Sequence, residues 1–347
     1  MENIHIISED KTLLEALIQL NTLVPEPLVL FVVDNQQRMV GTLTDGDSRR
    51  ALIAGASKND IIKNAMQQDF KFLQVKVNYD VKHIHELKRM KIKLLPILDE
   101  SRHIIDIINF EKVKTKLPVD AVLMAGGRGE RLRPLTEKTP KPLLKIGDKP
   151  IIDYNIDNLI SYGIEHISVT VNYLAEQIEQ HFSTPRNGVV VNTIREPHFL
   201  GTVGSVKFIP HFFHDTILIM NSDLFTNVDF EDFYLHFVEN DADLSAVAIP
   251  YSVSVPYGIF EIDNRRDICG IKEKPTYNYY ANGGIYMIKR SILADIPENT
   301  FFNATDLIEK LIIQGKKVIR FPLNGTWIDI GNKQEYDKAQ EIAKHIT

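Results

Sequence analysis

A stretch rich in glycine and basic residues directly follows an apolar run, and it limits the possible folds more than any other feature. The apolar run at 119–124 predicts a buried strand. Glycines after a strand let backbone N–H groups approach a phosphate closely, at the sheet edge where α/β proteins bind ligands. The glycines are Gly126, Gly127 and Gly129, and the basic residues are Arg128, Arg131, Arg133 and Lys141. We predict a triphosphate site here, with a plain tight turn as the alternative.

Two common phosphate loops do not fit this stretch. A dinucleotide-binding fingerprint requires a third glycine where this chain has Leu132. A Walker A loop requires Gly-Lys followed by Ser or Thr, which the stretch lacks. The loop therefore belongs to another class of phosphate site.

The motif itself is Gly-Gly-x-Gly-x-Arg-Leu-x-Pro-Leu-Thr, followed by Pro-Lys-Pro-Leu at 140–143. It resembles the signature of the sugar-1-phosphate nucleotidyltransferases, also called NDP-sugar pyrophosphorylases, and the resemblance covers 119–347. Strands and helices alternate after Val119, which favours an α/β fold with a mixed, mainly parallel sheet. The resemblance makes this a Rossmann-like, GT-A-like nucleotidyltransferase domain.

The resemblance also implies which residues bind the nucleotide. They are Leu123, Ala125, Gly126, Gly127, Gly129, Glu196, Gly201 and Thr202. Glu196 precedes Gly201 by five residues, the spacing with which the family faces the nucleobase. The Watson–Crick edge of guanine has two adjacent hydrogen-bond donors, N1–H and the N2 amino group, and a carboxylate can accept from both. We therefore favour GTP as the nucleotide. The alternative is that the backbone of Leu123–Gly126 selects the base and Glu196 is a solvated loop residue.

Catalytic and metal-binding roles follow from the same resemblance. Asp223 ends an apolar strand and Asp329 precedes a glycine; together they would bind Mg²⁺ through hard carboxylate oxygens. Arg131 and Lys141 would hold the nucleotide phosphates, and Lys274 the phosphate of the sugar. The expected sugar-phosphate site comprises Tyr257, Gly258, Glu273, Lys274 and Asn282. Glu130 departs from the usual Ser or Thr of the family, and we expect its side chain to point away from the phosphates.

The first third of the chain contains an internal repeat. Residues 28–34 and 93–99 match with an offset of 65, and the order strand, helix, strand, strand, helix occurs twice. This order resembles a tandem pair of CBS domains, an α+β module, across 1–115, separate from the domain at 119–347. The resemblance implies that Thr44 and Asp47 contact a ribose, so an adenine nucleotide is a candidate ligand. In the second copy Asn109 and Lys112 replace Thr44 and Asp47, so we predict at most one nucleotide site in the pair. The alternative is that the pair serves only for packing or dimerisation and binds no nucleotide.

Composition excludes several classes of protein. A net charge of −6 gives no basic surface for nucleic acid, and no apolar run is long enough for a membrane span. One cysteine, Cys269, excludes an intramolecular disulfide, and we expect it to be a small core or loop residue. We expect a cytoplasmic homo-oligomer.

The function that these observations favour is transfer of a nucleotidyl group from an NTP to a sugar 1-phosphate, releasing pyrophosphate. The resemblance to CBS-fused guanylyltransferases implies a supply of activated sugar for surface glycans or nonulosonic acids. The alternatives are a uridylyl-, thymidylyl- or cytidylyltransferase, and a catalytically silent nucleotide sensor. A silent sensor would be expected to lack a metal carboxylate or the motif arginine, and this chain has both.

Among the predicted elements, we expect a helix over 150–161 ended by Gly163, a strand over 166–171 and a helix over 206–213.

Overall fold

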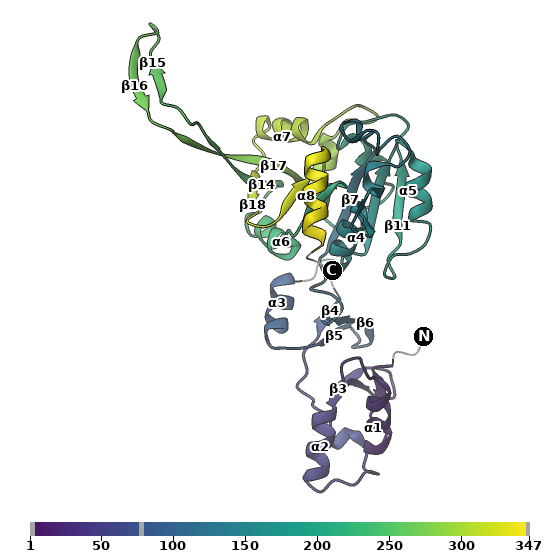
Figure 1. The fold of residues 1–347 in the computed structure, drawn as a ribbon. Helices are drawn as coiled ribbons and strands as arrows, with labels where there is room; N and C mark the ends of the chain where they lie inside the picture. The colour runs from purple at the N-terminus through teal and green to yellow at the C-terminus, as the bar shows by residue number, and fades with distance from the viewer. Residues whose placement is uncertain (1–3, 76–79, 345–347) are drawn as a thin grey trace. The chain divides into compact units, whose positions relative to one another are not determined.

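The computed structural model describes residues 4–75 and 80–344, and the chain forms two compact units (Figure 1). One unit comprises Met1–Leu117 with Ser161–Gly163, and the other comprises Pro118–Ile160 with Ile164–Thr347. Among the helices in the described ranges, none combines the length and apolarity that crossing a bilayer requires.

The second unit is built on a seven-stranded mixed sheet. Its order is β11 (Val191–Arg195), β10 (His166–Val171), β7 (Val119–Ala125), β12 (Thr216–Asn221), β17 (Thr276–Lys289), β14 (Leu244–Ser254) and β18 (Val318–Pro322). The first four strands are parallel, and β17 pairs antiparallel with both β12 and β14. The α/β fold with a mixed, mainly parallel sheet is therefore confirmed. The strand predicted at 166–171 is β10 to the residue.

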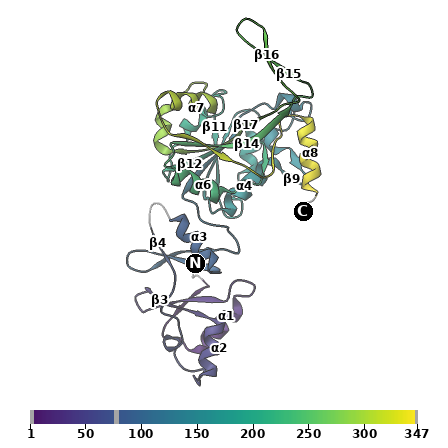
Figure 2. The same ribbon diagram turned by 90° about the vertical axis from the view of Figure 1, so that its left-hand side faces the viewer.

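Helices lie on both sides of this sheet (Figure 2). They are α4 (Ile151–Ser161), α5 (Ala175–His181), α6 (Phe230–Glu239), α7 (Ala304–Ile313) and α8 (Lys333–Ala343). The helix expected over 150–161 is α4, and Gly163 follows it with φ +70°. The helix expected over 206–213 is wrong: a 3₁₀ helix at Gly204–Phe208 ends before Pro210. Proline disfavours helical backbone in the residue before it and cannot donate a helical hydrogen bond.

Strands β14 and β17 are longer than the sheet and leave it together as a two-stranded ribbon (Figure 1). The ribbon continues into β15 (Ile259–Ile262) and β16 (Ile268–Lys272), which pair only with each other. We call residues 249–281 the arm. Cys269 is exposed on β16, so the expectation of a small core or loop residue is wrong.

The first unit contains two three-stranded sheets of the same topology. The first consists of β1 (Ile6–Ser8), α1 (Leu13–Thr22), β2 (Val29–Val33), β3 (Met39–Thr44) and α2 (Asp45–Ile53). The second consists of β4 (Leu73–Gln74), α3 (Val81–Arg89), β5 (Leu94–Leu98) and β6 (Ile104–Asn109). Each has one parallel and one antiparallel pair, and the same irregularity in register recurs 65 residues later.

The repeat is nevertheless incomplete. The second copy has no helix corresponding to α2 among residues 110–118, so the expected final helix is wrong. The two copies share a core around Phe31, Met39, Leu94 and Leu98. Each copy also has a core cluster of its own, so the shared cluster joins two small cores into one unit.

Candidate functional site

The site is assembled where four parallel strands end. Met124 at the end of β7 is paired with Asn221 of β12, and Ala125 with Val171 of β10. The N–H group of Glu196, directly after β11, donates to Val171 O at 2.9 Å. Loops that are far apart in the chain therefore begin at one edge of the sheet, as expected for a ligand site in an α/β fold.

The glycine loop requires its glycines at two positions. Gly129 has φ +64°, and a Cβ there would lie 3.0 Å from Thr136 Cγ2 and 3.1 Å from Lys141 Cβ. A Cβ on Gly126 would lie 2.7 Å from Glu196 Oε1. Side chains at either position would push apart the elements that line the site. The loop is thus held close both to a basic residue and to a buried acid.

Two carboxylates and two basic side chains meet beside this loop. The strands β13 (Leu224–Thr226) and β19 (Trp327–Asp329) pair antiparallel, and the pair Leu224 with Asp329 places Asp223 next to Asp329. Lys141, which is buried, forms an ion pair with Asp223, and its Nζ lies 3.9 Å from Asp329 Oδ1. The guanidinium of Arg131 packs against Gly331, where a Cβ would be 3.2 Å from Nη2. The structure therefore brings together four residues that the sequence assigned to catalysis or metal binding.

The electrostatics of this group favour an additional cation. Burial, and then the neighbouring Asp223 carboxylate, raise the pKa of Asp329, while Lys141 and Arg131 offset part of that rise. Because the folded-state pKa lies above the ordinary value, ionisation of Asp329 costs stability as pH rises through that pKa. A divalent cation between the two carboxylates would remove this cost. Two hard oxygen ligands are a suitable donor set for Mg²⁺.

Side chains that sequence analysis missed fix the position of Asp223. Ser222 is buried and its Oγ donates to Met124 O at 2.7 Å, which ties the loop after β12 to the end of β7. Asn155 of α4 donates through Nδ2 to the carbonyls of Ser222 and Leu224, at 3.2 and 2.9 Å. Their contacts join residues 67–98 positions apart, so no local pattern could have predicted them.

Glu196 is a buried acid at the other end of the site. It is 5% exposed, and its Oε2 accepts from the Leu200 N–H group at 3.2 Å. The alternative reading of Glu196 as a solvated loop residue is therefore wrong. Burial raises the pKa of Glu196, and the hydrogen bond from Leu200 opposes that rise. A ligand that donated hydrogen bonds to this carboxylate would stabilise its ionised form.

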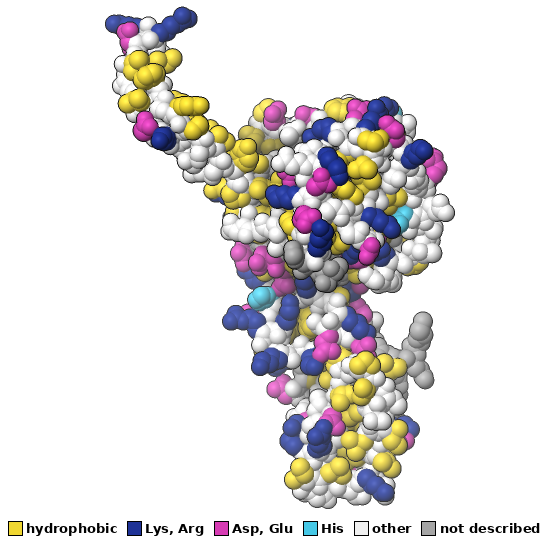
Figure 3. Space-filling view, viewed as in Figure 1, with side chains coloured by type: hydrophobic (Ala, Val, Ile, Leu, Met, Phe, Trp, Pro, Cys, Tyr) yellow, Lys and Arg dark blue, Asp and Glu magenta, His cyan; other side chains and the backbone are white. Residues whose placement is uncertain are grey.

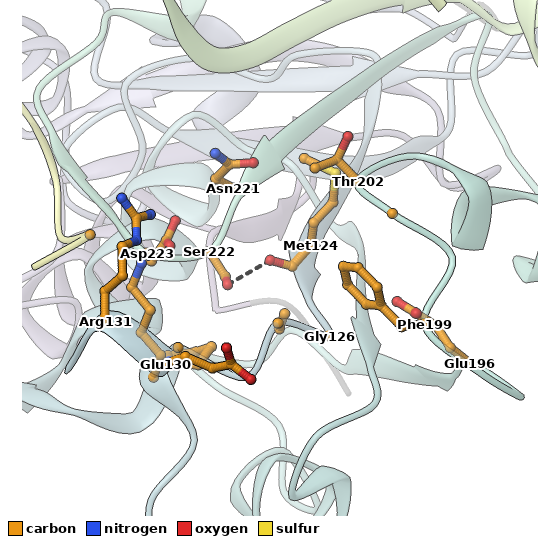
Figure 4. Close-up of a pocket in the computed structure, with 17 residues that line it drawn as sticks. Met124, Gly126, Glu130, Arg131, Glu196, Phe199, Thr202, Asn221, Ser222 and Asp223 are labelled. Carbon is orange, nitrogen blue, oxygen red and sulfur yellow. Dashed lines mark hydrogen bonds and ion pairs between the residues drawn. The ribbon is translucent and has the colours of Figure 1, made fainter. Parts of the chain in front are cut away.

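These groups line one cavity of about 380 Å³ (Figure 4). The predicted residues that line it are Ala125, Gly126, Gly127, Gly129, Arg131, Lys141, Glu196, Gly201, Thr202 and Asp223. The lining residues that sequence analysis did not select are Met124, Glu130, Pro142, Phe199, Asn221, Ser222 and Gly331. Leu123 is fully buried inside β7 and does not reach the cavity.

Three further expectations change with the structure. Glu130 lines the cavity, so the expectation that its side chain points away is wrong. The Thr202 hydroxyl accepts from the Ala304 N–H group at 2.7 Å and so caps α7, a structural role. The first four residues of the expected sugar-phosphate site do not line the cavity: Tyr257, Gly258, Glu273 and Lys274 lie in the arm.

Asn282 lies where the arm leaves the sheet. It donates to Tyr286 Oη at 2.8 Å. Two residues further on, Gly284 packs so closely against the cavity residue Asn221 that a Cβ would lie 2.5 Å from Asn221 Nδ2. The root of the arm therefore adjoins the cavity, although the arm itself extends away from it.

The fold and the loop at the sheet edge are typical of an α/β protein that binds phosphate groups, and comparison with known proteins identifies its family. Residues 120–345 match the family described as Nucleotidyl transferase, and the chain belongs to this family. The chain is 29% identical over 231 residues to a D-glycero-alpha-D-manno-heptose 1-phosphate guanylyltransferase of Aneurinibacillus thermoaerophilus, covering 65% of this chain and 99% of that protein.

Another relative acts on a different nucleotide. The chain is 28% identical over 239 residues to a UTP–glucose-1-phosphate uridylyltransferase of Synechocystis, covering 63% of this chain and 62% of that protein. A solved structure from Bacillus anthracis, described as a glucose-1-phosphate thymidylyltransferase with sucrose, matches with a TM-score of 0.53 and 22% identity. It covers 66% of this chain and 96% of that one, and it supports the fold alone.

We predict that Asp223→Asn lowers the pKa of Asp329. The change removes the like charge beside Asp329 and frees Lys141 to pair with it, and both effects favour the ionised form. Titration of ¹³C-labelled aspartate carboxyls by NMR measures this. Asp243→Asn, which removes an acid that contacts Lys289 and Lys317, should leave the pKa of Asp329 unchanged. An unchanged or higher pKa in Asp223→Asn would contradict this account of the site.

Proposed function

We propose that this chain transfers a nucleotidyl group from an NTP to a sugar 1-phosphate and releases pyrophosphate. One observation carries the proposal: the glycine loop, two basic side chains and two carboxylates line or adjoin a single cavity at the carboxyl ends of parallel strands. A phosphate-binding loop alone would serve many functions. The added carboxylate pair suits a reaction in which negative charge must be neutralised at a phosphorus atom.

The reaction requires positioning and charge neutralisation rather than a protein nucleophile. An oxygen of the sugar phosphate attacks the α-phosphorus, and the bond from that phosphorus to the leaving pyrophosphate breaks in line. Arg131 would hold the leaving β- and γ-phosphates, and Lys141 the phosphates around the reacting centre. Gly126, Gly127 and Gly129 would direct backbone N–H groups at the same oxygens. No covalent enzyme intermediate is needed, because orientation and electrostatics supply large rate factors.

We also propose that Asp223 and Asp329 hold Mg²⁺. Support comes from their adjacent positions on paired strands and from the raised pKa of Asp329. When bound, the ion would supply positive charge at the α-phosphate. In the structure Lys141 pairs with Asp223, so binding of a cation and nucleotide would release Lys141 to contact phosphate oxygens.

Asp223→Asn and Asp329→Asn are each expected to lower kcat by at least about a hundredfold while the fold persists. Each change removes one of two proposed ligands, so the α-phosphate loses its main counter-charge. Pyrophosphate release measures the rate, and circular dichroism checks the fold. Asp337→Asn, an exposed acid paired only with Lys333 among the described contacts, is the control and should retain full activity. Near-normal turnover in Asp329→Asn would refute the metal assignment.

GTP is the proposed nucleotide. Guanine presents two adjacent donors, N1–H and the N2 amino group, and a carboxylate offers two acceptor oxygens. Glu196 is buried, lines the cavity and lies against Gly126, which fits a base-binding role. Uracil and thymine would place a carbonyl against the carboxylate. A buried carboxylate that faces a carbonyl oxygen costs on the order of a few kcal/mol, which is enough for strong discrimination of guanine from uracil and thymine.

We expect kcat/KM to be higher for GTP than for UTP, dTTP or CTP in the wild type. Glu196→Gln should narrow that preference, because an amide presents one acceptor and one donor group in place of two acceptors. Because the pKa of Glu196 is raised, the GTP preference of the wild type should also weaken as pH falls through that pKa. UTP or dTTP as the best substrate would overturn the base assignment and leave the reaction class intact.

A catalytically silent sensor is the weaker alternative, because Arg131, Lys141, Asp223 and Asp329 are all present and adjacent. Activated sugars for surface glycans or nonulosonic acids remain the proposed use of the product. The sugar-phosphate role of Tyr257, Gly258, Glu273, Lys274 and Asn282 also remains a proposal.

For the first unit we propose a tandem CBS-like pair, supported by its two copies of one topology. Thr44 and Asp47 form a capping box at the start of α2, and Asp47 also binds Arg50 and Gln67. This role needs no ligand. In the second copy Asn109 and Lys112 both contact Glu26, at 3.0 and 2.7 Å.

Calorimetric titration of the full chain with AMP, ADP and ATP, with the cavity saturated by GTP, is therefore expected to find at most one adenine-nucleotide site per chain. Thr44 and Asp47 remain the candidate ribose ligands, and the second copy lacks an equivalent carboxylate. Binding of two adenine nucleotides per chain under these conditions would contradict the prediction.

A further inference from the structure

A cluster of one acid and two histidines lies where the parallel strands of the central sheet begin, at the edge opposite the cavity. Asp120 is the second residue of β7, and the parallel ladder pairs it with His166, the first residue of β10. Directly paired residues point to the same face of a sheet, so this carboxylate and this imidazole lie side by side. The segment that leads into β12 brings a third residue, His214, to the same place.

Asp120 is buried, and backbone groups hold its carboxylate in place. Its Oδ2 atom accepts hydrogen bonds from the N–H groups of Phe213 and His214, both at 2.8 Å. These two bonds give Asp120 a structural role, but they use only one of its two oxygens. The other oxygen, Oδ1, faces Nδ1 of His214 at 3.4 Å.

The separation of Asp120 Oδ1 and His214 Nδ1 suits two ligands of one metal ion better than a hydrogen bond. Hydrogen bonds from N–H to oxygen span about 2.7–3.2 Å between the heavy atoms. Two atoms bound to a tetrahedral Zn²⁺ through bonds of about 2.0–2.1 Å lie about 3.3 Å apart. His166 completes the set, since one ligand atom from each of the three residues lies within 4.8 Å of the other two. A small side-chain rotation closes the remaining gap, which is at most about 1.5 Å for such an ion.

Two imidazoles beside one carboxylate are more than an ordinary ion pair requires. One carboxylate balances one imidazolium, and a second protonated ring beside the first would be repelled by it. A metal ion instead binds both rings in their neutral form and the carboxylate as well. The ring of His166 is stacked on that of Phe213, with centroids 3.9 Å apart, so its orientation is already fixed. The cluster is therefore preorganised for a shared ligand.

We propose that Asp120, His166 and His214 bind a divalent transition-metal ion, with Zn²⁺ the best match. Two imidazole nitrogens and one carboxylate oxygen form a donor set that suits Zn²⁺, whereas Mg²⁺ prefers oxygen ligands alone. Both histidines are half-buried, which gives the ion a path from solvent. Water completes the tetrahedron. This site is distinct from the carboxylate pair at the cavity, and it does not rest on the proposed function.

The ion joins three segments of the chain at the amino-terminal ends of their strands. Its expected effect is on stability, because the unfolded chain does not hold the three ligands together. It does not act in the cavity, since Met124 lies four residues beyond Asp120 along β7, roughly 13 Å at about 3.3 Å per residue.

Zinc titration of the full-length chain tests the proposal. The chain is stripped with a chelator, and calorimetry follows Zn²⁺ binding with excess Mg²⁺ present to compete at sites made of oxygen ligands alone. His166→Phe and His214→Asn each remove one ligand, and the phenyl ring at 166 keeps the stack on Phe213. Each change should weaken zinc binding by at least about a hundredfold, because loss of even an outer-shell partner costs roughly 10–100-fold. Asp120 stays intact in these variants, because its backbone hydrogen bonds support the fold.

Scattered surface histidines also bind zinc weakly, so the titration includes a matched control. On the face of the molecule in Figure 3, histidine side chains lie singly. His83 of α3 is exposed and lies 3.8 Å from the Glu86 carboxylate, so it too is a histidine beside an acid. His83→Asn should leave the zinc affinity unchanged.

Co²⁺ gives a second readout, because its visible absorption is intense in tetrahedral sites and weak in octahedral ones. The wild type should show the tetrahedral spectrum, and both histidine variants at the cluster should lose it. Zn²⁺ should raise the Tm of the wild type and of His83→Asn only, while circular dichroism checks that every metal-free variant is folded. The proposal is overturned if the wild type binds no zinc, if the cluster variants bind it as tightly as the wild type, or if the Co²⁺ spectrum is octahedral.

Discussion

The parallel pairing of β7 with β10 and β12 is the constraint on which the site depends. Because of this register, the three strands end at the same edge of the sheet. The glycine loop, Asp223 and the loop after β10 therefore all begin at that edge. A shift of one residue would turn every side chain of a strand to the opposite face. The buried residues of β7, 119–123 and 125, prevent such a shift because both faces of the strand are covered. Ser222 and Asn155 then fix Asp223 by hydrogen bonds that only this register allows.

The arm is a consequence of the same sheet. Strand β17 pairs antiparallel with β12, so its first residues emerge at the end of β12 where Asn221 lines the cavity. A ribbon that leaves the sheet there is rooted in the site but extends away from it. The length of β14 and β17 beyond the sheet thus accounts for the position of the arm.

Much of the fold could be predicted from sequence because periodicity is local. Strand β10 at 166–171 was predicted to the residue, since alternation and flanking turn residues define such strands. The cavity residues followed from motifs, and ten predicted residues line it. The orientation of Glu130, by contrast, depends on how the loop packs, and the prediction was wrong.

Other features could not be predicted for physical reasons. The contacts of Ser222 and Asn155 join distant segments, and a single chain carries no signal for them. Alternating residues at 249–254 indicate a strand, but they do not reveal that this part of β14 pairs with β17 alone, whereas residues 244–248 also pair with β18. The second repeat lacks the final helix because the structure of 110–118 depends on what packs around it. The 65-residue offset between the repeats carries no information about that packing.

Phosphorus NMR tests the central claim most directly. Wild-type chain is incubated with GTP, Mg²⁺ and a panel of sugar 1-phosphates, and the products are followed by their ³¹P signals. The account predicts that at least one sugar 1-phosphate is consumed, with a diphosphate diester and pyrophosphate appearing in equal amounts. Consumption of GTP to GDP and phosphate, or to GMP and pyrophosphate with the sugar 1-phosphate unchanged, would contradict nucleotidyl transfer to a sugar phosphate.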